Sequence, residues 1–244
     1  MKQFYHDCHV HLDLYRNTND IISHIDKNKS YTIAVTNLPI LYEKAVVIFP
    51  SSKYVRFALG FHPELVGKFP EQIPKFYEKL VNCRYIGEIG LDFSRDNLEH
   101  KELQVEVFKK AIKICNELGG KILSIHSRGS TQEVIDIIGS KFNGHIIMHW
   151  FSGDIIQIRK SIENDYYFSI NVEMIRTAKG KRIISEIPLN RILIESDGPF
   201  TRTVKREYNV HYIEEIVIFL CEIKGIGETE MCNQLKSNFR RILE

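Results

Sequence analysis

The sequence predicts an α/β fold in which eight parallel strands close into one TIM-type (β/α)8 barrel. Short apolar segments rich in β-branched residues alternate with amphipathic segments along the chain, as they do in a parallel sheet covered by helices. The 244 residues are close to the roughly 250 that one such barrel usually needs. Because no composition shift or flexible linker interrupts the alternation, we expect a single domain over residues 1–244.

In the first half of the chain, four apolar segments are short enough to be buried parallel strands. We expect strands that end near residue 9 and that span residues 31–36, 54–59 and 85–88, with helices at 20–27, 41–49 and 71–81. The sequence Gly-Phe-His-Pro at 60–63 ends the third strand, because proline lacks a backbone donor and restricts the residue before it.

The second half repeats this order. Residues 103–118 form the longest amphipathic segment, and the two glycines at 119–120 end the predicted helix. Strands are expected at 121–126, 145–149, 166–170 and 192–195, and two helices at 212–223 and 228–242 follow them. The sequence Ser-Thr-Gln-Glu at 130–133 predicts a capping box at the start of another helix.

The composition sets limits on partners and compartment. The net charge of +2, from 33 basic and 31 acidic residues, neither requires nor excludes a polyanionic substrate, so a local basic patch would have to bind one. The five cysteines are odd in number and form no disulfide or metal pattern, which is typical of reduced thiols. No apolar stretch approaches the roughly 20 residues of a membrane span, and we see no signal peptide. We therefore expect a cytoplasmic protein.

Side chains that can bind metal stand at the ends of several predicted strands. His9 and His11 are two residues apart, so both imidazoles point to the same side of an extended strand. The ends of barrel strands share one face, where imidazole and carboxylate together suit Zn, Mn, Fe or Co, and a wet, carboxylate-rich site also accepts Mg. We expect one or two divalent metal ions (Mg, Mn or Zn) with these ligands: His9, His11, Glu88, His126, His149 and Asp197.

Two of these carboxylates have possible catalytic roles. Glu88 could bridge two ions, and Asp197 could accept a proton from the attacking water. Each residue taken alone also has a structural interpretation. A histidine can be a hydrogen-bonded core residue, Glu88 a salt-bridged strand end, and Asp197 a cap of the following turn.

Other residues next to the strand ends are candidate substrate contacts. Arg128 and the loops after the last two strands, which include Arg202, could bind phosphate groups. Trp150, the only tryptophan, could stack on an unpaired base, and His62 could contact phosphate or a second ion. The alternatives are solvated surface charges, aromatic residues that close the barrel, and packing of His62 beside Pro63.

The motifs at these positions resemble the TatD family of metal-dependent deoxyribonucleases. They are DCHVHLD at 7–13, GFHP at 60–63, GEIGLD at 87–92, HSR at 126–128, HWFSG at 149–153 and ESDGPF at 195–200. The resemblance spans nearly the whole chain and implies a metal-dependent hydrolase barrel, a centre of one or two metals, and hydrolysis of DNA. It gives the ligand roles to the same six residues.

Three departures from the family pattern affect the substrate groove. Glu64 stands where the family commonly has a second histidine, Trp150 stands where it commonly has a cysteine, and a typical Arg-Gly-Lys-x-Asn-x-Pro stretch after the last strand is not recognisable. The variants HLDLY at 11–15, SIHSR at 124–128 and HWFSG at 149–153 look like the TatD-like component of Qat anti-phage operons. That narrower resemblance implies an anti-phage defence role alongside partner proteins.

Three functions therefore remain open from the sequence. The first is a deoxyribonuclease that hydrolyses DNA from single-stranded or frayed ends. The second is a small-molecule amidohydrolase of the deaminase or lactonase type, many of which use a lysine at the fourth strand, where this chain has Glu88. The third is a non-catalytic subunit of a defence complex, which would have no need for six aligned ligands.

Overall fold

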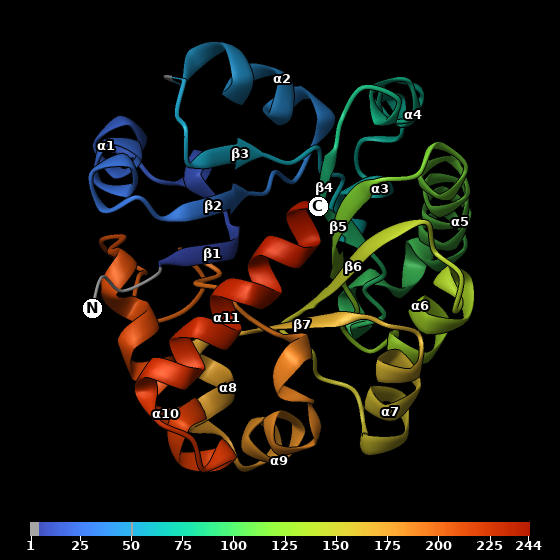
Figure 1. The fold of residues 1–244 in the computed structure, drawn as a ribbon. Helices are drawn as coiled ribbons and strands as arrows, with labels where there is room; N and C mark the ends of the chain where they lie inside the picture. The colour runs from blue at the N-terminus through green and yellow to red at the C-terminus, as the bar shows by residue number, and fades with distance from the viewer. Residues whose placement is uncertain (1–4, 50) are drawn as a thin grey trace.

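The computed structural model describes residues 5–49 and 51–244 and confirms the predicted barrel (Figure 1). The start of the first predicted strand, before residue 5, lies outside the described residues. All strand pairs are parallel, in the orders β1-β2-β3 and β4-β5-β6-β7-β8. The strands are β1 His6–Val10, β2 Tyr31–Ala34, β3 Val55–Phe57, β4 Tyr85–Gly90, β5 Lys121–His126, β6 Gly144–His149, β7 Tyr167–Ile170 and β8 Ile192–Ile194.

Two seams join the strand groups into a closed wall. At the first, Leu59 bridges to Ile86, and the backbone N–H of Gly87 donates to the carbonyl of Leu59 over 2.9 Å. At the second, the N–H of Asp197 donates to the carbonyl of His9 over 2.9 Å. The second seam joins the end of β1 to the segment after β8, so it fixes two of the predicted ligands relative to each other.

Helices surround this wall (Figure 1). Those that the sequence predicted are present, and the amphipathic faces of the longer ones supply the apolar layer outside the strands. They are α1 Thr18–Asn28, α2 Pro39–Ile48, α3 Pro63–Val66, α4 Ile73–Leu80, α5 Lys101–Leu118, α6 Thr131–Ile138, α7 Ile155–Glu163, α8 Val172–Arg176, α9 Ala178–Glu186, α10 Ile213–Lys224 and α11 Glu228–Leu243. Short 3-10 turns lie at Leu12–Leu14, Pro70–Gln72, Arg95–His100, Leu189–Arg191 and Val210–Tyr212.

The predicted capping box before α6 is wrong. Ser130 precedes that helix, but its side chain makes no capping bond; its Oγ donates to the carbonyl of Leu91 over 2.7 Å instead. The hydroxyl is buried, and it bonds to this carbonyl directly after the end of β4. A capping box occurs instead before α7, where Asp154 accepts from the N–H of Gln157 over 2.8 Å and the Gln157 side chain accepts in return.

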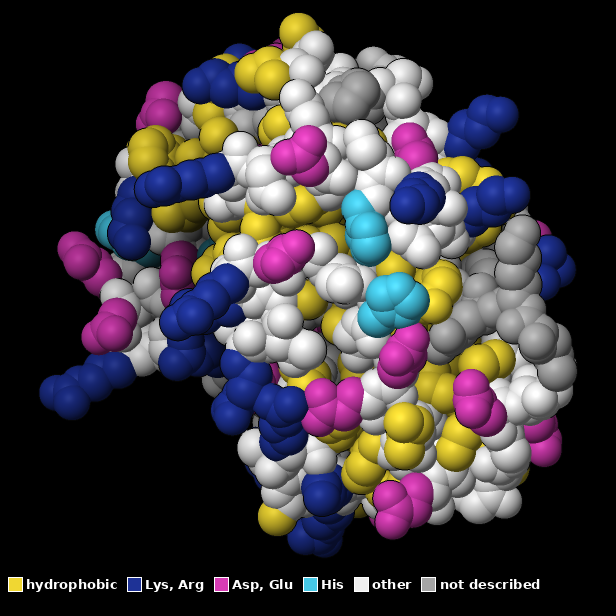
Figure 2. All heavy atoms as spheres, turned by 90° about the vertical axis from the view of Figure 1, so that its left-hand side faces the viewer, with side chains coloured by type: hydrophobic (Ala, Val, Ile, Leu, Met, Phe, Trp, Pro, Cys, Tyr) yellow, Lys and Arg dark blue, Asp and Glu magenta, His cyan; other side chains and the backbone are white. Residues whose placement is uncertain are grey.

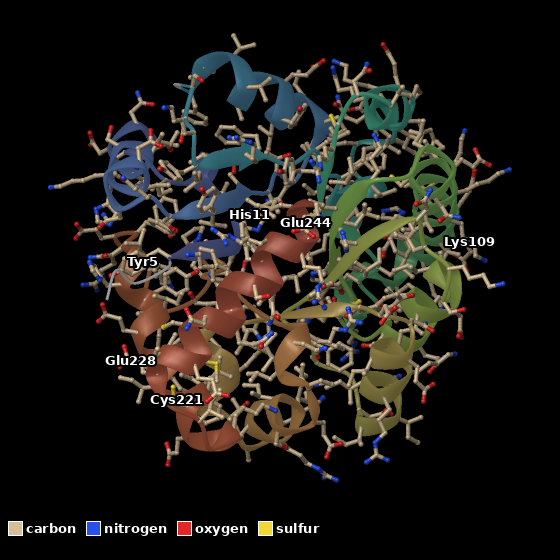
Figure 3. All side chains as sticks on the ribbon, viewed as in Figure 1. Tyr5, His11, Lys109, Cys221, Glu228 and Glu244 are labelled. Carbon is tan, nitrogen blue, oxygen red and sulfur yellow. The ribbon has the colours of Figure 1, made fainter. Side chains whose placement is uncertain are left out.

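Helix α11 closes one end of the barrel and leaves the other end for the site. It lies across the strands in Figure 1, and its Phe239 and Ile242 pack among barrel-interior residues such as Cys8 and Leu193. Figure 3 places His11 near the middle of the barrel, whereas Lys109 on α5 points outward. The C-terminal strand ends therefore remain available for chemistry, as in other barrels of this kind.

The remaining general predictions have mixed outcomes. All five cysteines are free thiols, and three of them are buried. Among the described residues, no helix has the length and apolar character that crossing a membrane requires. The single domain over residues 1–244 stays a prediction.

Candidate metal centre

The carboxylate of Glu88 lies at the centre of the predicted ligand set and is only 3% exposed. Its Oε2 atom lies 3.4 Å from Nε2 of His9 and 3.3 Å from Nε2 of His11. The Oδ1 atom of Asp197 approaches the same two nitrogens, at 3.6 and 3.7 Å. One face of Glu88 thus meets two imidazoles and a second carboxylate.

The other oxygen of Glu88 meets a different set of imidazoles. Oε1 lies 2.7 Å from Nδ1 of His126 and 3.4 Å from Nε2 of His149. Nε2 of His62 is 3.5 Å from the same oxygen. Glu88 therefore separates two groups of donor atoms, one on each of its oxygens.

The donor spacing fits bound divalent ions. The ligand atoms of His9, His11 and Asp197 lie within 4.8 Å of one another, as do those of His9, Glu88 and His149. Two ligand atoms about 2.1 Å from one ion are about 3.0–3.4 Å apart in tetrahedral or octahedral geometry. These buried imidazoles and carboxylates face one another at this spacing. A bound cation would stabilise such a set of buried donor atoms.

His62 differs from the other histidines in its hydrogen bonding. Its Nδ1 accepts from the backbone N–H of Glu64 over 3.3 Å, at the start of α3. The proton of the neutral ring then lies on Nε2, which points toward Glu88 as a donor rather than as a metal ligand. A ring nitrogen of His62 also lies within 4.8 Å of ligand atoms of Glu88 and His126, so contact with phosphate and contact with a second ion both stay predictions.

Two glycines let β4 approach its neighbour at the centre. A Cβ atom at Gly90, whose φ is +143°, would lie 2.0 Å from the carbonyl oxygen of His126, and one at Gly87 would lie 2.9 Å from Cβ of Ser124. Only residues without a side chain allow this approach. The Gly-Glu-Ile-Gly sequence therefore brings Glu88 against His126.

Three buried residues orient the histidines, and the sequence prediction missed them. Each accepts or shares a hydrogen bond with the ring nitrogen that points away from the centre. The pairs are His9 Nδ1 with Ser124 Oγ at 2.7 Å, His126 Nε2 with Asp92 Oδ2 at 2.8 Å, and His149 Nδ1 with Glu195 Oε2 at 3.0 Å. Such partners fix the ring tautomer at metal sites. Asp92 and Glu195 are charged residues next to predicted ligands in otherwise apolar segments, which is the signal that could have identified them.

Asp7 holds the β1 end of the site against β8. Its Oδ1 accepts from the backbone N–H groups of His9, at 3.1 Å, and Ser196, at 3.0 Å. Its Oδ2 accepts from the hydroxyl of Tyr208 over 3.0 Å. The first residue of the Asp-Cys-His-Val-His motif is therefore a structural anchor and does not belong to the group of donor atoms.

The electrostatics of the site favour a charged Glu88. Burial opposes its ionisation, but the surrounding imidazoles, with His62 and His149 first, outweigh that effect and hold the pKa of Glu88 well below its usual range. Burial lowers the pKa of His9 to about 3, and the nearby His149 acts in the same direction. His9 is thus neutral at physiological pH, the form that binds metal.

His126 has the opposite charge preference. Burial lowers its pKa, but the hydrogen bonds to Asp92 and Glu88 outweigh burial and raise the pKa to about 9. Without an ion, this imidazole is protonated at neutral pH. A cation that binds at Nδ1 would have to displace that proton, while Nε2 keeps its bond to Asp92.

Asp197 combines an unusual backbone with a shifted pKa. Its φ is +45°, a left-handed conformation that a residue other than glycine seldom adopts, and its N–H is bonded to the carbonyl of His9. Burial raises the pKa of Asp197 well above its usual range; His149 opposes this shift, and Glu195 and Glu88 add to it. A carboxyl group in this environment can hold a proton near neutral pH.

A cavity of about 690 Å³ opens over these residues. Arg128 and Trp150 line it together with His62 and Phe200, so three of the predicted substrate contacts are brought to the centre. Arg202 is not: its Nη2 is paired with Glu173 at 2.9 Å, and it lines an adjoining cavity.

The aromatic residues after the strand ends divide into two classes. Phe61 and Phe151 are buried in the core and pack against Phe76 and Phe168, so they close the barrel top. Trp150 is partly exposed, and Phe200 is 57% exposed. Of these four aromatic residues, only Trp150 and Phe200 are available to a ligand.

Comparisons with known proteins agree with this geometry. The family model described as TatD related DNase matches residues 6–244. A metal-dependent hydrolase of Methanocaldococcus jannaschii is 28% identical over 235 residues, which cover 93% of this chain and 90% of that protein. The deoxyribonuclease TATDN3 of Homo sapiens is 26% identical over 258 residues, which cover 95% and 92% of the two chains.

Solved structures share the fold. The TatD homologue YJJV of Escherichia coli superposes with a TM-score of 0.85 at 19% identity, over 99% of this chain and 98% of that one. A phosphotriesterase homology protein of Escherichia coli superposes with a TM-score of 0.66 at 16% identity, over 100% of both chains. At these identities the likeness concerns the barrel alone.

Proposed function

Because this chain belongs to the TatD-related DNase family and is a metal-dependent hydrolase, we propose that it cleaves DNA phosphodiester bonds from single-stranded or frayed ends. The observation that carries the proposal is the position of Glu88 between two groups of donor atoms. A carboxylate placed in this way can hold two cations close together, an arrangement that suits phosphoryl chemistry.

The two donor groups assign the ligands. His9, His11 and Asp197 would hold one ion with Oε2 of Glu88, and His126 and His149 would hold the other with Oε1. Divalent ions, when bound, neutralise charge on the phosphate and lower the pKa of a coordinated water. We propose that Mg or Mn is the bound metal, because sites that contain carboxylate ligands and admit water accept both ions.

The protein's own groups supply the remaining steps. The Asp197 carboxylate, which is ionised when it holds a cation, would accept the proton of the attacking water. Arg128 lines the cavity with an exposed guanidinium group, which can pair with a non-bridging phosphate oxygen. The His62 Nε2–H points into the same space and can donate to phosphate or to Glu88.

The shape and charge of the site support a strand end as the substrate. A cavity of about 690 Å³ is of the size that holds a small ligand, so it can admit one or two nucleotides but not a duplex. In Figure 2, Lys and Arg side chains are mixed with Asp and Glu side chains across the face that is shown. With a net charge of only +2, binding should involve few phosphates and show a shallow salt dependence.

A time course on end-labelled single strands, duplexes and sealed circles, with and without chelator, tests the proposal. We expect metal-dependent shortening of single strands and of frayed duplex ends. Equal cutting of sealed circles, or cleavage that survives chelator, would reject the end-directed metal mechanism. Turnover of a lactone or an amide without cleavage of any nucleic acid would favour the amidohydrolase.

The narrower resemblance to the Qat component supports a place for this nuclease in anti-phage defence with partner proteins. Phage plating on cells that carry the whole operon, with wild-type chain or with Glu88→Gln, tests that role. Equal protection by both versions would indicate a non-catalytic subunit.

A further inference from the structure

We propose that a second cavity beside the metal centre binds one nucleobase of the substrate strand, stacked on Trp150. The inference rests on the proposed action on DNA and names where the strand lies next to the scissile phosphate. The cavity measures about 510 Å³ and lies between the segment after β6, the helices α8 and α9, and the loop after β8. That volume is within the range of pockets that bind small ligands.

The two cavities adjoin each other. Trp150, Ser152 and Phe200 line both of them, so the two aromatic side chains stand at their shared border. The Trp150 ring lies 6.4 Å from the ring of His149, centroid to centroid. A strand with its phosphate at Glu88 can therefore place the adjacent base across this border.

The walls of the second cavity have the chemistry of a base site. Its floor is apolar and buried, formed by Phe151, Met174 and Ile183. Its aromatic wall offers a flat face, which can stack on any unpaired base. The basic residues at its edge, Lys179 and Lys205, can neutralise a neighbouring phosphate.

The charges in the cavity indicate which part of the nucleotide enters. Arg202 is compensated by Glu173, which accepts from its Nε over 2.9 Å and from its backbone N–H over 3.1 Å. Lys179 donates to the carbonyl of Ser152 over 2.5 Å, whereas Lys205 has no hydrogen bond or ion pair within the described chain. A phosphate near Glu173 would meet a carboxylate, so the base faces inward and the phosphate stays toward Lys205.

Trp150 is held in place by the residue that also orients a metal ligand. Its φ is +39°, and its backbone N–H donates to Oε1 of Glu195 over 3.1 Å. The other oxygen of Glu195 accepts from Nδ1 of His149. The aromatic wall and the metal-facing imidazole therefore share one buried anchor, which sets the base site at a fixed distance from the reacting phosphate.

The single tryptophan makes the proposal measurable without catalysis. Wild-type protein in chelator is titrated with a labelled single-stranded tetranucleotide and with the same tetranucleotide lacking its bases. Anisotropy of the label gives affinity, and tryptophan emission reports stacking. We expect emission to change only with the base-bearing strand, which should bind at least about fivefold more tightly.

Variants separate stacking from general binding. Trp150→Ala should lose the preference for the base-bearing strand, and Trp150→Phe should keep part of it. The matched control is Phe69→Ala, an aromatic residue with 38% exposure that lines neither cavity. It should bind like the wild type.

The inference is overturned if both strands bind equally, if neither binds, or if emission stays constant while anisotropy shows saturation. Base-dependent binding without any DNA cleavage would instead retain the base site and reject the proposed nuclease. Cleavage of DNA with no effect of Trp150→Ala on base preference would retain the proposed nuclease and reject the base site.

Discussion

Replacing Glu195 with glutamine tests whether the buried carboxylate behind His149 supports the metal centre. Glu195 is fully buried and has four donors around it: His149 Nδ1 at 3.0 Å, Asn171 Nδ2 at 2.8 Å, the Trp150 N–H at 3.1 Å and the hydroxyl of Ser169. Glutamine has nearly the same shape but only one accepting oxygen. Its amide N–H₂ group would face donors, and at least one of them would lose its partner.

The size of the effect follows from these contacts. Leaving a buried donor without a partner costs about 1–3 kcal/mol, so the free energy of unfolding of the metal-free protein should fall by that amount. Loss of the carboxylate behind a metal-binding histidine typically weakens metal affinity 10- to 100-fold, or about 1.4–2.7 kcal/mol. The two effects are separate, because the first is measured without an ion.

Isothermal titration with Mn²⁺ and urea unfolding in chelator measure the two quantities. The chain offers a matched control in Glu214, whose Oε1 lies 2.7 Å from Nδ1 of His211 at the surface, with about half of each side chain exposed. Glu214→Gln should change both quantities by less than about 0.5 kcal/mol. Unchanged Mn²⁺ affinity in Glu195→Gln would refute the role of this carboxylate in orienting His149.

Three further predictions concern other residues. Asp197→Asn should keep the unfolding midpoint in chelator, because asparagine tolerates a φ of +45°, but should lower turnover about 10²- to 10⁴-fold; near-wild-type turnover would make Asp197 only a turn cap. Burial lowers the pKa of His6 to about 3, so between about pH 6.5 and about pH 3 only the unfolded chain binds a proton at this residue. The free energy of unfolding should therefore fall by about 1.4 kcal/mol per pH unit on acidification through this range. Urea unfolding of His6→Gln in chelator should show a shallower pH dependence. Arg128→Ala should reduce kcat/KM for single-stranded DNA more than for bis(4-nitrophenyl) phosphate, because the small diester has no neighbouring phosphate; an equal loss on both would refute a contact between Arg128 and a neighbouring phosphate of the strand.

The strands and helices were largely predictable because their signals are local. Apolar periodicity identified all eight strands, and the errors lie at their ends. The third strand was expected over residues 54–59 but spans Val55–Phe57, since Leu59 pairs only through the bridge that closes the barrel. Helices α3, α7, α8 and α9 were not predicted; α3 has four residues and α8 has five, and Thr177 caps α9 directly after α8.

The sequence by itself determined the barrel and the residues that could bind metal. Strand periodicity and the type of residue at each strand end depend only on residues that are close together in the chain. It could not decide which nitrogen of each histidine faces an ion, because that depends on partners far away in the chain, such as Glu195, which lies 46 positions from His149. It also could not separate Arg128, which lines the metal cavity, from Arg202, which pairs with Glu173 in the next one. Only the closed barrel, which brings distant strand ends to one face, made those distinctions.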